Sequence, residues 1–232
     1  MNILQEAASR GAKTLSEHDS KRLLAEDGIP VTGERIAASA DEAVRAAAEI
    51  GYPVVLKGSG ESISHKTEMN LIALNLSSEA EVREAFTRLM SSGATAEVLV
   101  QQMIKGDREL VVGMTRDAQF GPCVMFGLGG VFTEVLQDVA FRVAPLSRRD
   151  ATEMMDDIRA KKILQSFRGK PAVDREALAD ILINVGRMGL ERELIGEIDI
   201  NPLKVPGGKP VAVDALVVLQ SGTNLSGTER EK

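Results

Sequence analysis

The order in which apolar runs and amphipathic stretches follow one another is the feature that most constrains the fold of this chain. Up to about residue 95, short apolar runs typical of strands alternate with longer stretches that carry apolar residues at helical spacing. This alternation predicts an α/β lobe. The expected strands lie at residues 31–37, 53–58 and 71–76, and the expected helices at 16–30, 39–53 and 77–93. Ser16 and Ser39 are the expected N-caps, and Gly28 and Gly51 the expected helix ends.

The second half of the chain has a different pattern. It opens with three apolar, β-rich runs separated by turn residues, which favour an antiparallel sheet, and two helical stretches and two further strands follow. The expected strands lie at 96–104, 108–115, 121–129, 140–146, 195–205 and 210–219, and the expected helices at 149–167 and 174–193. The overall fold class is therefore α/β (α+β), in two lobes.

We expect four segments along the chain. Residues 1–14 form an N-terminal extension, 15–95 an N-terminal lobe and 96–220 a larger sheet lobe. Residues 221–232, "SGTNLSGTEREK", are polar and rich in Gly, Ser and Thr, which is typical of a disordered tail. A cleft between two lobes is a common place for a ligand.

Composition excludes several classes of protein. The formal net charge of −6, with no Lys/Arg cluster, argues against a nucleic-acid surface. No apolar run is long enough to span a membrane, and the first residues lack the apolar core of a signal peptide. Cys123 is the single cysteine, so no intrachain disulfide is expected and a reducing, cytoplasmic location is predicted.

The most informative chemical signal is a set of oxygen donors near the end of the chain. In a strand, Glu197, Asp199 and Asn201 of "EIDINPL" project to one face, because side chains alternate with period two. Asp214 interrupts the apolar run "PVAVDALVVL", which a hairpin would bring beside the first strand. An exposed polar sheet face is the alternative, but Asn and Asp are poor strand residues. Oxygen ligands of this kind suit Mg²⁺, which shares its coordination with waters and substrate phosphates.

Two further patterns are compatible with a phosphate site. Lys57 ends the strand "PVVLKG", where an amino group can hold a phosphate, although a solvated lysine is the commoner outcome there. In "MFGLGGVFTEV", Gly127, Gly129 and Gly130 let backbone N–H groups approach an anion, and a tight turn between strands is the alternative. Glu134 follows, where a carboxylate could coordinate a metal or orient a nucleophile.

Other positions have two interpretations each. Arg142 offers a guanidinium to a phosphoryl group, and an ordinary salt bridge is equally compatible. The segment around Gln101 and Met103, with Glu109 at the next strand, could form a slot for adenine, or simply two core strands and a surface turn.

A family resemblance is carried by several motifs, which are, in order, "PVVLKG", "SHKTE", "VLVQQM", "REL", "FGLGGVFTEVLQDVAFRVAPL", "EIDINPL" and "AVDA". Together they resemble the ATP-grasp domain that forms the β subunit of the ADP-forming acyl-CoA synthetases. These enzymes are relatives of succinyl-CoA synthetase. The resemblance covers roughly residues 12 to 220. It implies that ATP or ADP lies in the cleft between two lobes, with Mg²⁺ as cofactor.

The resemblance also implies roles for individual residues. Lys57 matches the lysine that contacts nucleotide phosphates, and His65 the histidine that is transiently phosphorylated. A neutral imidazole at pH 7 can attack a γ-phosphoryl group. The other matches are Gln101 and Met103 at the adenine hinge, Glu109 at the ribose, Asn201 and Asp214 at Mg²⁺ with Asp199 adjacent, and Glu134 and Arg142 beside the phosphohistidine. His18, on the polar side of a helix, is expected to need no ligand.

The chain departs from the family pattern in two places. Asn70 and Leu71 follow "SHKTE" where the family commonly has two glycines, and Gln102 replaces a glutamate in the hinge. No Gly-rich turn of the dinucleotide type follows an early expected strand, so CoA binding is expected from a separate α subunit. The resulting hypothesis is the nucleotide-binding subunit of a synthetase that relays phosphate through His65. Another ATP-grasp carboxylate ligase, or a non-catalytic nucleotide-sensing module, is the alternative.

Overall fold

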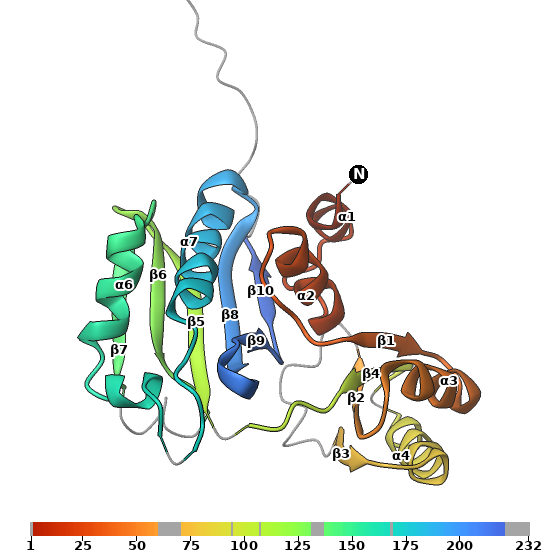
Figure 1. Cartoon of the computed structure of the whole chain (residues 1–232). Helices are drawn as coiled ribbons and strands as arrows, with labels where there is room; N and C mark the ends of the chain where they lie inside the picture. The colour runs from red at the N-terminus through yellow and green to blue at the C-terminus, as the bar shows by residue number, and fades with distance from the viewer. Residues whose placement is uncertain are drawn as a thin grey trace, which may run out of the picture.

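Two antiparallel sheets organise the part of the chain that the structure describes, which is residues 2–59, 71–93, 95–106, 108–130, 137–167 and 169–220 of a computed structural model. The smaller sheet contains β1 (Glu34–Ala37), β2 (Val54–Ser59), β3 (Ile72–Leu76) and β4 (Glu97–Gln102), in the order β1-β4-β2-β3. The larger contains β5 (Glu109–Asp117), β6 (Gly121–Leu128), β7 (Val139–Val143), β8 (Ile195–Lys204) and β10 (Leu216–Leu219), in the order β10-β8-β5-β6-β7. The short β9 (Val211–Ala212) pairs with β8. The two sheets lie side by side in Figure 1.

Helices α3 (Ala40–Ile50) and α4 (Glu79–Ser91) cover one face of the smaller sheet (Figure 1). Ser39 caps α3 by accepting a hydrogen bond from the backbone N–H of Glu42, and Gly51 ends this helix at a φ of 94°, a conformation that favours glycine. The apolar stripes of both helices pack on alternate strand residues such as Val54 and Leu56. The expected helices and strands of this region are therefore confirmed.

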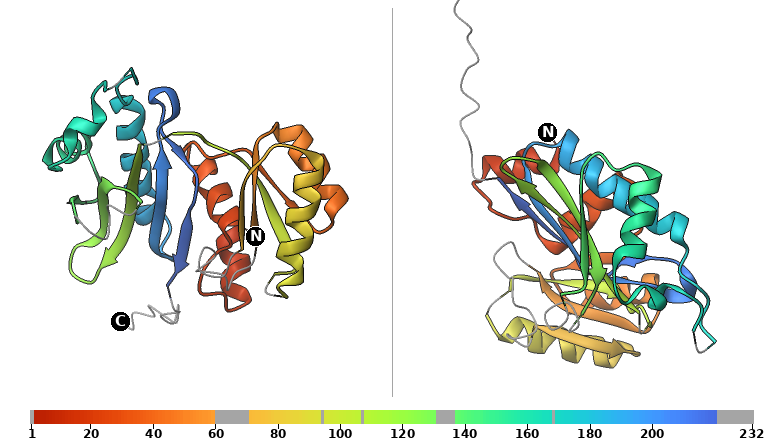
Figure 2. Two further views of the ribbon diagram at one scale, coloured as in Figure 1. Left: turned by 90° about the horizontal axis from the view of Figure 1, so that it is seen from below. Right: turned by 90° about the vertical axis from the view of Figure 1, so that its left-hand side faces the viewer.

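Helices α6 (Arg148–Asp157) and α7 (Arg175–Glu191) cover one face of the larger sheet, as Figure 2 shows from two sides. The expected helix at 149–167 is shorter than predicted, because the backbone leaves the helix at Ile158 and forms a 3₁₀ turn, η1, at Lys161–Leu164. The expected strand at 210–219 is divided into β9 and β10 by residues 213–215. The loop before β9 contains a second 3₁₀ turn, η2, at Pro206–Gly208.

The N-terminal residues belong to the core of the larger sheet. Helix α1 (Ile3–Ser9) and helix α2 (Glu17–Glu26) contribute Leu4, Leu23 and Leu24 to the same buried cluster as β5, β8 and α7. Residues 13–15 also form hydrogen bonds with β10. We expected α2 in the N-terminal lobe and residues 1–14 as an extension, but their apolar side chains are buried against the sheet formed by the end of the chain.

Strand β4 also differs from the expectation. We expected the run at 96–104 to open the sheet of the second half, but β4 lies between β1 and β2 in the smaller sheet. An apolar run predicts a strand without identifying its neighbours, because the pairing is decided by contacts distant in sequence. The chain thus passes between the two cores twice, near 30–33 and near 103–108.

None of the helices that the structure describes is both long enough and apolar enough to cross a bilayer.

The position of α2 in the larger core predicts the effect of a truncation. Leu24 is 0% exposed, so Leu24→Ala should lower the free energy of unfolding by about 2–5 kcal/mol through lost burial and a residual cavity. Leu74→Ala on β3 is the control, because Leu74 is 57% exposed and should change stability by less than about 0.5 kcal/mol. Urea unfolding of both variants measures the difference. Equal effects would contradict the assignment of α2 to the core.

Candidate functional site

The face of the smaller sheet opposite α3 and α4 carries a lysine. In β2, Val54 and Leu56 point into the helix-covered core, so Lys57 points to the other face by the two-residue alternation of a strand. In β4, Val98 and Val100 point into the core, and Gln101 therefore shares the face of Lys57. These polar side chains turn toward the larger sheet.

Lys57 bridges the two sheets. Its Nζ lies 2.6 Å from Glu17 Oε1 on α2, 3.7 Å from Asp214 Oδ2 and 3.4 Å from the carbonyl oxygen of Val213. Its side chain is only 7% exposed. The lysine and Asp214, both expected at a nucleotide site, are thus brought together from segments 157 residues apart.

Electrostatics keep this lysine charged. Burial lowers the pKa of Lys57, but the carboxylates of Asp214 and Glu17 outweigh it and hold the pKa above its ordinary value. An ammonium group that stays protonated at neutral pH can neutralise an incoming phosphate.

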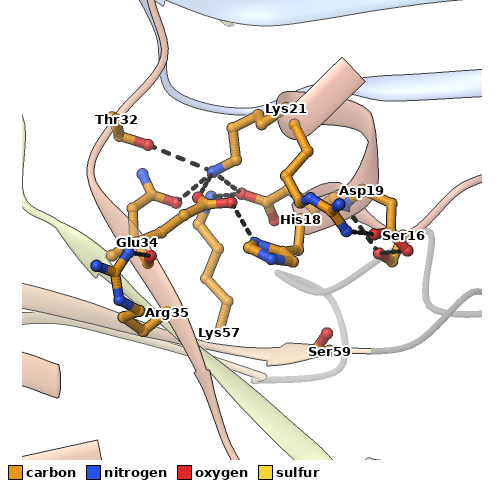
Figure 3. Close-up of polar contacts among 12 residues, drawn as sticks. Ser16, His18, Asp19, Lys21, Thr32, Glu34, Arg35, Lys57 and Ser59 are labelled. Carbon is orange, nitrogen blue, oxygen red and sulfur yellow. Dashed lines mark hydrogen bonds and ion pairs between the residues drawn. The ribbon is translucent and has the colours of Figure 1, made fainter. Parts of the chain in front are cut away.

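Helix α2 contributes a second buried lysine that we did not expect here. Lys21 is 1% exposed, and its Nζ lies 2.8 Å from Glu17 Oε1 and 3.0 Å from Gln101 Oε1. It also contacts Glu34 of β1 (Figure 3). The signal was present in the sequence, because Glu17 and Lys21 precede the buried Leu24 at helical spacing and so share its face.

His18 lies at the edge of this group of charged side chains and has a polar partner there. Its Nδ1 is 2.9 Å from Glu34 Oε1, and its side chain is 26% exposed (Figure 3). The expectation that His18 needs no ligand stays a prediction, but its position beside the buried cluster was not foreseen.

The oxygen donors of the larger sheet also converge. Asp199 and Asn201 share one face of β8, and Asp199 is paired in register with Leu216 of β10. The backbone N–H of Val213 donates to the carbonyl oxygen of Pro202 at 3.1 Å, which brings Asp214 to the end of β8 that carries Asn201. The Asn201 side-chain oxygen accepts a hydrogen bond from the backbone N–H of Gly130 at 3.3 Å.

A cation fits this donor set. Burial, together with the carboxylates of Glu197 and Asp214, raises the pKa of Asp199 to about 6. A divalent ion would relieve this repulsion between carboxylates, and Mg²⁺ completes its coordination with waters and phosphates. In the described ranges, no three or more His, Cys, Asp or Glu side chains form a group that could hold a metal ion by themselves.

The expected adenine hinge is only partly compatible with the structure. Gln101 is 1% exposed, and its side chain is bonded to Lys21 and to the carbonyl oxygen of Val213. The backbone N–H of Met103 donates to the carbonyl oxygen of Pro53 at 3.2 Å. Glu109, at the start of β5, lies 3.1 Å from the Nζ of Lys204. The Gln101 side chain therefore has a structural role.

The glycine run is explained by close backbone packing. A Cβ on Gly129 would lie 2.5 Å from the carbonyl oxygen of Leu110, and one on Gly127 would lie 2.5 Å from that of Asp138. Gly130 has a φ of 65°, where side chains are strained. These contacts require glycine whether or not an anion binds there.

Of the three predicted catalytic residues, Arg142 is the one within the described ranges, and it lies apart from this group. Arg142 lies on β7, at the opposite edge of the larger sheet from β10, and its guanidinium is 2.5 Å from Asp157 Oδ2 on α6. This is the salt bridge that we had considered as its alternative. His65 and Glu134 lie outside the described residues.

Residues 6–219 match the ATP-grasp domain family, which is most of the chain. The chain belongs to the ATP-grasp family. The resemblance inferred from the sequence motifs is thereby confirmed, as is the two-sheet α+β fold.

The ATP-grasp chain is similar over nearly its full length to named relatives. It is 43% identical over 221 residues to the β subunit of ADP-forming acetate–CoA ligase I of Pyrococcus furiosus, covering 92% of this chain and 95% of that subunit. The ADP-forming acetate–CoA ligase II of Archaeoglobus fulgidus is 43% identical over 88% of this chain, which spans 30% of that longer protein.

Solved structures agree with this relationship. Acetyl-coenzyme A synthetase 1 of Ca. Korarchaeum cryptofilum, in complex with coenzyme A and Ca-AMPCP, has a TM-score of 0.91 at 44% identity, covering 94% of this chain and 98% of that chain. Another structure of that protein contains Mg-AMPPCP, with its phosphohistidine segment pointing towards the nucleotide-binding site, and has a TM-score of 0.85 at 44% identity over the same shares of the two chains.

Packing at the glycine run of this ATP-grasp domain predicts a loss of stability on substitution. Gly129→Ala should lower the free energy of unfolding by about 1–3 kcal/mol, because the added methyl group meets backbone rather than a flexible side chain. Gly33→Ala is the matched control, because its Cβ would lie 3.9 Å from the nearest atom, the Gln102 side-chain oxygen. Denaturant titration compares them, and a stable Gly129→Ala protein would contradict the packing explanation.

The raised pKa of Asp199 predicts a pH-dependent stability. The folded carboxyl holds its proton more tightly than the unfolded chain does, so its contribution is favourable at low pH and is lost as pH rises through about 6. Asp199→Asn should therefore stabilise the metal-free protein at about pH 7.5, with a much smaller effect at about pH 4.5. Thermal unfolding in a chelator measures this difference. The exposed Glu84→Gln on α4 is the control, and a pH-independent effect of Asp199→Asn would be evidence against the shift.

Proposed function

We propose that this chain is the nucleotide-binding β subunit of an ADP-forming acyl-CoA synthetase, which catalyses acid + CoA + ATP ⇌ acyl-CoA + ADP + phosphate. The observation that carries the proposal is the approach of Lys57 to Asp214 across the two sheets, with Nζ and Oδ2 3.7 Å apart. The similarity to β subunits of acetate–CoA ligases over nearly their full length supports it.

Different residues of this chain would bind the metal, the phosphates, the adenine and the ribose of Mg-ATP. Asp214, Asn201 and Asp199 would hold Mg²⁺, whose charge would stabilise the transferring phosphoryl group. Lys57 would neutralise phosphate charge from the smaller sheet, as its raised pKa allows. Met103 and Glu109, on the connection between the sheets, would receive adenine and ribose. Gln101 would lie beside the adenine without a free side-chain amide, since that amide is bonded to Lys21 and to the carbonyl oxygen of Val213.

Phosphate transfer is assigned to His65. A neutral imidazole nitrogen would form a bond to the γ-phosphorus of ATP as the bond from that phosphorus to the bridging oxygen breaks, and ADP leaves. Glu134 and Arg142 are proposed to flank the phosphohistidine. The Arg142–Asp157 ion pair would have to open or be shared for Arg142 to take this part.

A CoA-binding α subunit is the proposed partner. The Pyrococcus furiosus relatives are named as the β subunits of ADP-forming acetate–CoA ligases I and II, which implies a second subunit in those enzymes. In the longer Archaeoglobus fulgidus relative, the region matched by this chain is 30% of one polypeptide. A partner that supplies the remaining functions is consistent with both arrangements.

Labelling with radioactive phosphate tests the relay. Incubation of the chain and its partner with Mg-ATP, or with acyl-CoA and phosphate, should produce an acid-labile, base-stable phosphate on this chain. The label should disappear in His65→Ala, because no nitrogen remains to accept the phosphoryl group, whereas Mg-ADP binding measured by calorimetry should persist. Equal labelling in His65→Ala would refute the relay. Mg-ADP binding with no label in the wild-type protein would instead favour a nucleotide sensor.

A further inference from the structure

A buried cluster of charges lies where α2 meets the smaller sheet. It comprises Glu17 and Lys21 of α2, Glu34 of β1 and Lys57 of β2, whose side chains are 4%, 1%, 7% and 7% exposed. Figure 3 shows Lys21, Glu34 and Lys57 converging on one point. The two lysines and two glutamates balance one another in formal charge, which is the condition under which buried charges are tolerated.

Among the described residues, Glu17 makes the shortest polar contact with Lys57. Glu17 Oε1 lies 2.6 Å from Lys57 Nζ, against 3.7 Å for Asp214 Oδ2. The same oxygen is 2.8 Å from Lys21 Nζ, so Lys21 fixes the carboxylate while the carboxylate fixes Lys57. Short charged hydrogen bonds of this kind restrict a flexible lysine to one position.

The carbonyl oxygen of Val213 is a second point of convergence. It accepts hydrogen bonds from Lys21 Nζ at 3.3 Å, Lys57 Nζ at 3.4 Å and Gln101 Nε2 at 3.1 Å. Val213 immediately precedes Asp214. The cluster therefore fixes both the ammonium group proposed to hold phosphate and the peptide next to a proposed metal ligand.

We propose that Glu17, held by Lys21, is a positioning residue that places the Lys57 ammonium group for the nucleotide phosphates. This inference rests on the proposed nucleotide site. Glu17 need not touch the nucleotide, since Lys57 has three N–H donors and can keep the Glu17 bond while donating to a phosphate. The cost of ordering the lysine is then met on folding rather than on binding.

The direction in which Glu17→Gln changes the affinity for nucleotide distinguishes a positioning role from a simple effect of charge. Glu17→Gln removes a negative charge, so charge alone would tighten binding of an anionic nucleotide. Positioning predicts the opposite, because a neutral amide oxygen holds the Lys57 ammonium group less strongly than a carboxylate does, and because Lys57 gains an unbalanced neighbour in Lys21. Among the described residues, Glu34 and Asp214 are the other carboxylates whose charge acts on Lys57.

The experiment is calorimetric titration of the full chain with Mg-ADP. Four proteins are compared: wild type, Glu17→Gln, Lys57→Met and the double variant. Glu17→Gln should weaken ADP binding by about 10-fold or more at pH 7, roughly the difference between a hydrogen bond to a charged group and one to a neutral group. In the Lys57→Met background the same change should alter affinity by less than about 2-fold, because Glu17 acts through Lys57.

The dependence of the Glu17→Gln effect on Lys57 is the reading that a merely structural role would not change, because a general loss of stability would weaken ADP binding equally in both backgrounds. Asp27→Asn is the matched control. Asp27 is a buried carboxylate just after α2, 2.5 Å from the guanidinium of Arg192, and its loss should leave ADP affinity within about 2-fold.

Each outcome decides the matter. Unchanged or tighter binding by Glu17→Gln, or equal weakening in both Lys57 backgrounds, overturns the positioning role. Equal binding of Mg-ADP by wild type and Lys57→Met, or none by either, is instead a failure of the proposed nucleotide site. If Glu17→Gln does not fold, Glu17→Asp keeps the charge, withdraws the carboxylate by one methylene and should show the same dependence on Lys57.

Discussion

The buried contact between Glu17 and Lys57 is the interaction on which the arrangement of the site depends. It joins α2, which packs in the core of the larger sheet, to β2 of the smaller sheet. Neither charge is stable in an apolar interior without its partner, because desolvation of a single ion is expensive. The two cores are therefore held in an orientation that keeps the pair together. That orientation also brings Lys57 to Asp214.

The path of the chain explains how this contact arises. The N-terminal helices pack with the strands formed by the end of the chain, and the smaller sheet is inserted between them in sequence. Residues 13–15 and 30–32 form hydrogen bonds with β10 and β9 on either side of α2. A helix anchored in this way offers a fixed face to the smaller sheet.

The distribution of charge on the two sides of the site suits a metal-bound polyphosphate. The larger sheet presents Asp199, Asn201 and Asp214, and burial together with the neighbouring carboxylates of Glu197 and Asp214 raises the pKa of Asp199. The smaller sheet presents Lys57, which retains its proton. A divalent cation would neutralise the carboxylates of the larger sheet, and the phosphate oxygens bound to that cation would pair with the Lys57 ammonium group. The similarity to ADP-forming acetate–CoA ligase subunits agrees with this chemistry.

Local patterns in the sequence determined most elements of the fold. Ser39 and Gly51 delimit α3 as expected, and the alternation in "EIDIN" places Asp199 and Asn201 on one face of β8. Period and capping are properties of neighbouring residues, so they can be identified without the fold. The motifs also identified the family, and they predicted that Lys57 and Asp214, which the structure brings 3.7 Å apart, belong to one nucleotide site.

Only the tertiary structure decided which elements lie together. It placed β4 in the smaller sheet, α2 in the larger core and Arg142 in an ion pair at the far edge. It also placed Glu17 and Lys21, which lie four residues apart on α2, in a buried cluster around Lys57. Strand pairing and burial depend on residues distant along the chain, and a periodic pattern carries no information about which distant surface will cover it.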